Sequence, residues 1–194
     1  MQKKESLSGQ STCRLFIGIR PDDASQIFLE GITDLCREQL KGISASHIRW
    51  ANPANRHLTL AFLGDTQKEK IPHLKQGIIE LAHSVNSFQS RIHSLNPFPR
   101  PQSSCLAVGL LPNPYLTALN EKCQQLISEL GMEPESKPYR PHITLARCKK
   151  GFRQLAPLSL DFPFLAKNII LYQSTPQVEQ SHYHPLLEVN LYAE

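Results

Sequence analysis

One pattern occurs twice in this 194-residue chain, and it limits the folds that the chain can adopt. Each copy has an apolar strand, an amphipathic helix, and then a strand that opens with His, Leu or Ile, Thr, Leu and Ala. The strands of the first copy are residues 14–19 and 57–64, and those of the second copy are residues 105–111 and 142–148. We therefore predict two similar lobes related by an approximate twofold axis.

The Pro-rich segment 95–104 separates the two copies and marks the middle of the chain. We expect a flexible leader over residues 1–12, followed by a single two-lobed domain over residues 13–194. Its similar halves are predicted at about residues 13–95 and 104–194. A chain of this length can bury one sizeable core or two closely joined ones.

The composition is that of an ordinary globular protein, with 40% hydrophobic and 20% charged residues. The chain has no run of eighteen apolar residues, and its first twelve residues lack the apolar segment of a secretory signal, so we expect no membrane association. Five Cys form no Cys-x-x-Cys pair, which favours a reduced, cytoplasmic protein. Residues 137–153 hold six Lys or Arg and no Asp or Glu, and we expect this run to bind phosphate.

The two strands that open with His carry the candidate site. Eight His and seven Thr in this chain would give fewer than one His-x-Thr triplet by chance, but the chain has two, at corresponding positions of the repeat. The pairs are His57 with Thr59 and His142 with Thr144. In each pair the side chains share one face of a strand, because strand side chains alternate. Polar groups on a buried strand need partners, so we expect the two strands to face each other across a cleft.

Two imidazoles and two hydroxyls around one point suit a phosphodiester. Displacement at phosphorus needs a base on the attacking oxygen and an acid on the leaving oxygen, and imidazoles titrate near neutral pH. Thr59 and Thr144 are predicted to hold the non-bridging oxygens, where negative charge develops. Spacing and symmetry do not distinguish the acid from the base.

Residues next to the second motif are further candidates. Arg140 lies two positions before His142 and could share its face, where its guanidinium would bind phosphate. Arg147 falls on the opposite face by alternation, so an ion pair and a substrate contact both stay open for it. Tyr139 is a candidate to stack on a base, whereas Phe62 is predicted to face away from His57 and pack in the core.

Metal catalysis is the competing interpretation. His182 and His184 could be two ligands, but neither has an Asp or Glu at ligand spacing, so we expect exposed histidines and no metal. A Gly-rich phosphate loop is also absent from the sequence, and we expect no cofactor.

The paired motifs HLTL and HITL, at residues 57–60 and 142–145, resemble those of the 2H phosphoesterase superfamily. The similarity is greatest to the bacterial RNA 2′,3′-cyclic phosphodiesterases, also called 2′-5′ RNA ligases. It extends to RLFIGIRPDD near the start, to RWANPANRHLTLAFLG and KPYRPHITLAR around the motifs, and to FPRP at the junction. Two features differ: Ala61 stands where a Lys is common, and His182 and His184 flank a Tyr that such proteins often have.

The resemblance implies an α+β fold, with two lobes that each have an antiparallel sheet and outer helices and that flank a central cleft. It implies hydrolysis of an RNA 3′-terminal 2′,3′-cyclic phosphate to a 2′-phosphate without metal. His57 would be the proton donor, His142 the proton acceptor, and Thr59 and Thr144 would orient the phosphate.

Three alternatives stay open at this point. The first is a reversible 2′-5′ RNA ligase of tRNA halves, and the second is an enzyme that processes small cyclic phosphates. The third is an RNA-binding module without turnover. The expected partners are RNA ends or small nucleotide 2′,3′-cyclic phosphates, and we expect a monomer.

Overall fold

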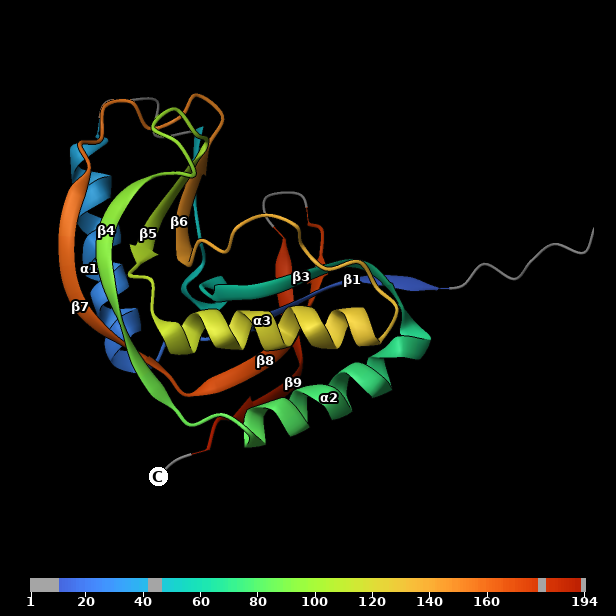
Figure 1. Cartoon of the computed structure of the whole chain (residues 1–194). Coiled ribbons are helices and arrows are strands. Elements are labelled where there is room, and N and C mark those ends of the chain that lie inside the picture. The colour runs from blue at the N-terminus through green and yellow to red at the C-terminus, as the bar shows by residue number, and fades with distance from the viewer. Residues whose placement is uncertain (1–10, 42–46, 178–180, 193–194) are drawn as a thin grey trace, which may run out of the picture.

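The computed structural model describes residues 11–41, 47–177 and 181–192 (Figure 1). The predicted leader therefore lies mostly outside the described residues, and its last residue, Thr12, begins the first strand. Twelve strands and helices follow one another in the order β1 (Thr12–Ile19), α1 (Asp23–Gln39), β2 (Ile48–Trp50), β3 (Leu58–Gln67), α2 (Ile71–His83), β4 (Phe88–Phe98), β5 (Cys105–Leu110), α3 (Pro114–Glu129), β6 (His142–Cys148), β7 (Leu158–Ala166), β8 (Asn168–Thr175) and β9 (His182–Asn190). Short 3₁₀ turns at Pro53–Asn55 and Lys68–Lys70 precede β3 and α2.

Within the described residues, nine strands form one antiparallel sheet in the order β7-β4-β5-β6-β3-β1-β8-β9, with β2 added beside β6. The pairing between strands is shortest at the middle of the sheet, where β3 and β6 pair only through Leu58 and Ile143. This junction divides the sheet into one lobe of β7, β4, β5 and β6 and another of β3, β1, β8 and β9. The predicted α+β class with two antiparallel lobes is confirmed.

The lobes do not follow the two halves of the chain. Strands β1 and β3, from the first half, pair with β8 and β9 from the end of the chain, whereas β4 pairs with β5 and β7. Each lobe thus combines strands from both predicted halves, 13–95 and 104–194. The periodicity of apolar residues predicts the local repeat of strand, helix and strand, but it cannot predict which distant strands pair.

The helices, like the strands, are exchanged between the two repeats. The side chain of Asp22 caps α1 through the Ser25 N–H, and α1 packs on β7 with the rings of Phe28 and Phe162 stacked 4.1 Å apart. In the second copy, α3 packs on β3. Helix α2, which follows the first motif, contacts both α3 and the β8–β9 pair. The helix of each repeat therefore covers the lobe that contains the His-x-Thr strand of the other repeat. None of the described helices is both long and apolar enough to cross a membrane.

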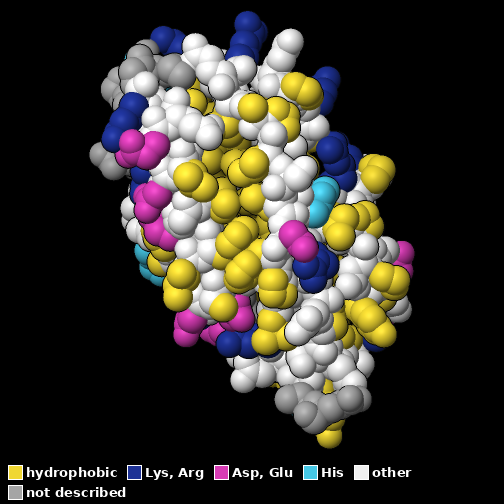
Figure 2. Space-filling view, turned by 90° about the vertical axis from the view of Figure 1, so that its left-hand side faces the viewer, with side chains coloured by type: hydrophobic (Ala, Val, Ile, Leu, Met, Phe, Trp, Pro, Cys, Tyr) yellow, Lys and Arg dark blue, Asp and Glu magenta, His cyan; other side chains and the backbone are white. Residues whose placement is uncertain are grey.

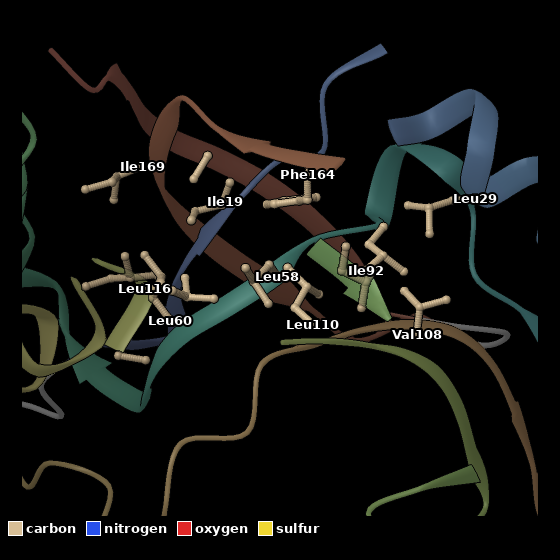
Figure 3. Close-up of a cluster of buried hydrophobic side chains, with 14 of the residues drawn as sticks. Ile19, Leu29, Leu58, Leu60, Ile92, Val108, Leu110, Leu116, Phe164 and Ile169 are labelled. Carbon is tan, nitrogen blue, oxygen red and sulfur yellow. The ribbon is translucent and has the colours of Figure 1, made fainter. Parts of the chain in front are cut away.

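A continuous apolar core lies beneath the junction of the lobes (Figure 3). Leu58 and Ile143, the pair that joins β3 to β6, are both fully buried in it. Since neighbouring side chains on a strand point to opposite faces, burial of this pair turns the residues on either side of it out of the core. The core thus fixes which side chains face the space between the lobes.

Candidate active site

The two His-x-Thr pairs meet at the junction of the lobes. Because Leu58 pairs with Ile143 in antiparallel register, the residues that flank one partner lie beside the residues that flank the other. His57, Thr59, His142 and Thr144 all line one cavity of about 410 Å³. The structure therefore brings together the four side chains that the sequence singled out.

Both imidazoles are held in the same way by the backbone. His57 Nδ1 lies 2.6 Å from the carbonyl oxygen of Asn55, and His142 Nδ1 lies 2.9 Å from the carbonyl oxygen of Arg140. A carbonyl oxygen only accepts hydrogen bonds, so each Nδ1 carries a hydrogen. Each Nε2 is then the nitrogen left to take or give a proton.

The surroundings of His57 are aromatic. Its ring centroid lies 4.6 Å from that of Phe16, 5.0 Å from that of Tyr183 and 5.9 Å from that of Tyr172. Gly18, on β1, lies beneath the motif, and a Cβ there would be 2.9 Å from the carbonyl oxygen of Leu58. The small residue lets β1 approach β3 closely under the imidazole.

His142 has a different neighbour. Its ring stacks on Phe98, with centroids 3.8 Å apart and an angle of 20° between the planes. The Arg140 guanidinium lies 4.9 Å from the centre of the same Phe98 ring. The ring plane of His142 is therefore fixed by stacking as well as by its Nδ1 hydrogen bond.

Burial and positive charge favour the neutral form of both imidazoles. Desolvation lowers the pKa of His57 to about 4, and the positive charges of His142 and Arg147 act in the same direction, against the hydrogen bond to Asn55. Desolvation also lowers the pKa of His142, and nearby Arg147 and Arg140 lower it further. A bound anion would oppose these effects, because it stabilises the protonated imidazole.

The sequence matches one known protein family. The family model described as the 2′-5′ RNA ligase superfamily matches residues 21–162, which is most of the chain and includes both motifs. The chain belongs to the 2′-5′ RNA ligase superfamily. The resemblance stated from the sequence is confirmed at this level.

Relatives agree with this assignment, and solved structures share the fold. A Bacillus subtilis protein named RNA 2′,3′-cyclic phosphodiesterase is 29% identical over 130 residues, which cover 64% of this chain and 71% of that protein. An Archaeoglobus fulgidus protein of the same name is 26% identical over 146 residues, 75% of this chain and 78% of its own. The folds of TT0787 from Thermus thermophilus and of E. coli LigT in complex with 3′-AMP are similar, with TM-scores of 0.82 and 0.73 and identities of 22% and 24%. Both cover 93% of this chain and are themselves covered to 99%.

Two β-bulges, one in β3 and one in β6, turn two further side chains toward the cavity. Leu60 has no partner in the β1–β3 register and Leu145 has none in the β5–β6 register, so each motif has an extra residue directly after its Thr. The bulge shifts the alternation, and Phe62 and Arg147, both five positions after a motif His, line the cavity. The prediction that Phe62 packs in the core is wrong, since the residue is 51% exposed.

Arg147 is exposed at the cavity, and among the described residues it makes no ion pair. Of the two roles left open by the sequence, a contact to substrate is therefore the one that the geometry favours. Alternation had placed Arg147 on the other face, and the bulge at Leu145 is the physical reason for the difference.

The other two candidates support the motifs instead of lining the cavity. The Tyr139 hydroxyl donates to the Thr59 carbonyl oxygen at 3.1 Å, and burial raises the pKa of this phenol. Arg140 lies over Phe98 and offers its backbone carbonyl to His142. Neither is among the cavity-lining residues, so substrate contact by either one stays a prediction.

Sequence reasoning missed two arginines of the cavity. Arg14 on β1 and Arg49 on β2 line it together with Arg147, and no Asp or Glu of the described residues does so. Arg14 is two positions before Phe16, which shares the cavity face, so alternation along RLFIGI contained a signal for it. Arg49 lies opposite Arg147 only because β2 pairs with β6, and its sequence neighbourhood does not indicate that pairing.

The two histidines at the start of β9 flank a cavity residue. His182 and His184 are exposed, with ring centroids 4.2 Å apart, and Tyr183 between them lines the cavity. In residues 11–41, 47–177 and 181–192, no three His, Cys, Asp or Glu side chains are grouped so that they could hold a metal ion.

Proposed function

We propose that this protein is a metal-independent RNA 2′,3′-cyclic phosphodiesterase of the cytoplasm that acts as a monomer. It hydrolyses a terminal 2′,3′-cyclic phosphate to a 2′-phosphate. The observation that carries the proposal is the pair of imidazoles with identical Nδ1 anchoring across one arginine-lined cavity. The names of the relatives from B. subtilis and A. fulgidus support the same substrate class.

In this mechanism His142 Nε2 accepts a proton from the attacking water while the water oxygen forms a bond to phosphorus. The bond from phosphorus to O3′ breaks, and His57 Nε2 gives its proton to O3′. Thr59 and Thr144 donate hydrogen bonds to the non-bridging oxygens, and Arg147 offsets their charge. Exchange with solvent then restores the starting proton on each imidazole.

The role of His57 as donor depends on the substrate. With a pKa of about 4 in the free protein, His57 is almost entirely neutral at pH 7. The anionic phosphodiester raises the pKa of both imidazoles when it binds, because an opposite charge favours the protonated form. Substrate binding thus helps to supply the proton that the leaving oxygen needs.

A shift of the pH optimum follows from these directions. The reactive free enzyme has one protonated and one neutral imidazole, and both pKa values lie below 6.5. We expect a bell-shaped profile of kcat/KM with its maximum below pH 6.5, and a kcat profile displaced to higher pH by the bound anion. Steady-state rates between pH 4 and 9, with a constant-ionic-strength buffer, measure both. A kcat/KM maximum above pH 8 would contradict the proposal.

The direct test uses a short RNA that ends in a 2′,3′-cyclic phosphate, incubated with the protein and EDTA. We expect hydrolysis that survives the chelator and a product that carries its phosphate on the 2′ oxygen. A 3′-phosphate product would show that the wrong ester bond breaks. RNA that binds without any product would instead support the non-catalytic binding module, and joined RNA ends would support the ligase.

A further inference from the structure

The two walls of the cavity differ in chemistry at equivalent positions. The bulges place Phe62 on the β3 side and Arg147 on the β6 side, although each residue is fifth after its motif His. The β3 wall continues with the aromatic rings of Phe16 and Tyr183. Of the arginines that line the cavity, Arg14 lies on β1 beside β3, whereas Arg49 and Arg147 lie on β2 and β6. The charged backbone of a nucleic acid that leaves the cavity would therefore be favoured on the β6 side.

Cations continue along β6 beyond the cavity. The strand runs from His142 to Cys148, and the turn that follows it begins with Lys149 and Lys150. At about 3.3 Å per residue, Lys149 lies roughly 17 Å along the chain from Thr144, enough for more than one nucleotide of an extended strand. We call Lys149 and Lys150, which follow the cavity residue Arg147, the basic ridge.

The basic ridge is available to a ligand. Both lysine side chains are exposed, and neither makes an ion pair with another described residue. The sequence has no Asp or Glu between Lys137 and Arg153 that could neutralise the ridge locally.

The positive charge continues past the end of the strand. Lys150 and Arg153 line a small hollow of about 40 Å³ there. Figure 2 shows Lys and Arg side chains projecting from the upper end of the molecule, the end where the loops after β4 and β6 lie in Figure 1. Cations that extend outward from a phosphate site form a path for further phosphates of the same strand.

We propose that the basic ridge binds the phosphodiester backbone upstream of the cyclic phosphate, so that the protein binds an RNA strand more tightly than a free nucleotide. This inference rests on the proposed function, and it adds a second contact region beyond Arg147, roughly 17 Å along the chain from Thr144. Binding at the ridge is electrostatic and independent of base sequence, since lysines contact phosphates as point charges.

The test compares two substrates in two variants of equal charge. The ridge variant is Lys149→Gln with Lys150→Gln, and the control is Lys122→Gln with Lys167→Gln, two exposed lysines outside the cavity. The substrates are adenosine 2′,3′-cyclic phosphate and a pentanucleotide that ends in the same group. We expect the ridge variant alone to raise the KM of the pentanucleotide about tenfold at low salt, with its kcat and the KM of the mononucleotide unchanged.

Salt dependence gives a second readout. For the pentanucleotide, the slope of log KM against log salt should fall by about 0.7 for each phosphate that the ridge variant no longer binds. Equal effects in the ridge and control variants would overturn the inference, because total charge and not the ridge would then set affinity. An unchanged ratio of the two KM values would also overturn it.

A failure of the proposed function can be distinguished from a failure of this inference. If neither substrate is hydrolysed, binding of a labelled pentanucleotide with a 3′-phosphate still tests the ridge by fluorescence anisotropy. The ridge variant should then bind about tenfold more weakly than the control variant. Equal affinities in that assay would show that the ridge makes no contact with RNA.

Discussion

Alanine at either His57 or His142 should lower the single-turnover rate of cyclic-phosphate hydrolysis by about 10²–10⁴. Each variant lacks one of the two proton transfers but retains the cavity, its arginines and the hydroxyls of Thr59 and Thr144. The double variant should lose little more than either single variant, because groups that act as a unit are not additive. Rapid quenching at saturating enzyme measures the chemical step without product release.

The matched control for these variants is His73→Ala, which removes an exposed imidazole of α2 that does not line the cavity. We expect the rate of this control to equal that of the unchanged protein. Near-full activity in either His57→Ala or His142→Ala would exclude the two-histidine mechanism, whatever the control shows.

A substrate with a different leaving atom shows which histidine is the acid and which is the base. In an RNA whose bridging 3′ oxygen is replaced by sulfur, the leaving thiolate needs no proton donor, since thiols are far more acidic than alcohols. The loss of rate in His57→Ala should therefore largely disappear with this substrate, while the loss in His142→Ala persists. The reverse result would exchange the roles of the two histidines.

The motifs were readable from the sequence because their signals are local. The repeat of strand, helix and His-x-Thr strand depends on apolar periodicity and on side chains two positions apart, and both survive in the structure. The pairing of Leu58 with Ile143 then converts this repeat into a cavity. Sequence symmetry was thus sufficient to predict that His57 and His142 lie near each other, and both line one cavity.

The directions predicted for the side chains of Phe62 and Arg147 were wrong for one physical reason. In both strands a bulge interrupts the alternation of side chains between the two faces. Leu60 and Leu145 look like ordinary strand residues, and both are buried, yet each is the unpaired residue of a bulge. A bulge between apolar residues leaves no mark in the hydrophobic pattern, so the faces of Phe62 and Arg147 were inverted. The bulges are set by backbone pairing with β1 and β5.

The sequence also did not reveal which distant strands pair with each other. The lobes exchange strands and helices between the two halves of the chain, because β1 pairs with β8 and β4 pairs with β5. Arg49 enters the cavity through the three-residue strand β2, which is too short to be recognised by periodicity. Long-range partners decide these positions, and a local pattern contains no information about them.

Glu30→Gln should destabilise the protein by about 2 kcal/mol, the second-largest effect that we expect. Arg56, directly before His57, is 1% exposed, and its Nη2 donates to Glu30 Oε2 at 2.5 Å and to the Thr33 hydroxyl at 3.2 Å. Its Nε and Nη1 have no hydrogen-bond partner among the described residues. Loss of the carboxylate leaves this buried guanidinium without its counter-charge, and the cost is below that of a fully buried pair because the Glu30 side chain is 39% exposed.

Removal of both charges should restore most of that stability. Arg56→Met replaces the buried cation by an apolar side chain of similar length, and it leaves Glu30 close to solvent, so this single variant should lose less than about 1 kcal/mol. The double variant of Glu30→Gln and Arg56→Met should resemble Arg56→Met alone. Urea unfolding at pH 7 measures the four free energies of the cycle, and additive losses would show that the two side chains are not coupled.

The pH dependence of the same pair gives an independent check. The hydrogen bond from Arg56 lowers the pKa of Glu30, so the folded state binds this proton less readily than the unfolded chain does. The resulting stability is present above the unfolded pKa of about 4.5 and disappears as the pH falls through the lower folded value. Arg56→Met should therefore lose less stability than the unchanged protein between pH 5 and pH 3. Equal acid sensitivity would show that Arg56 does not set the pKa of Glu30, and that Arg37, which lies 3.1 Å from the same carboxylate, does so instead.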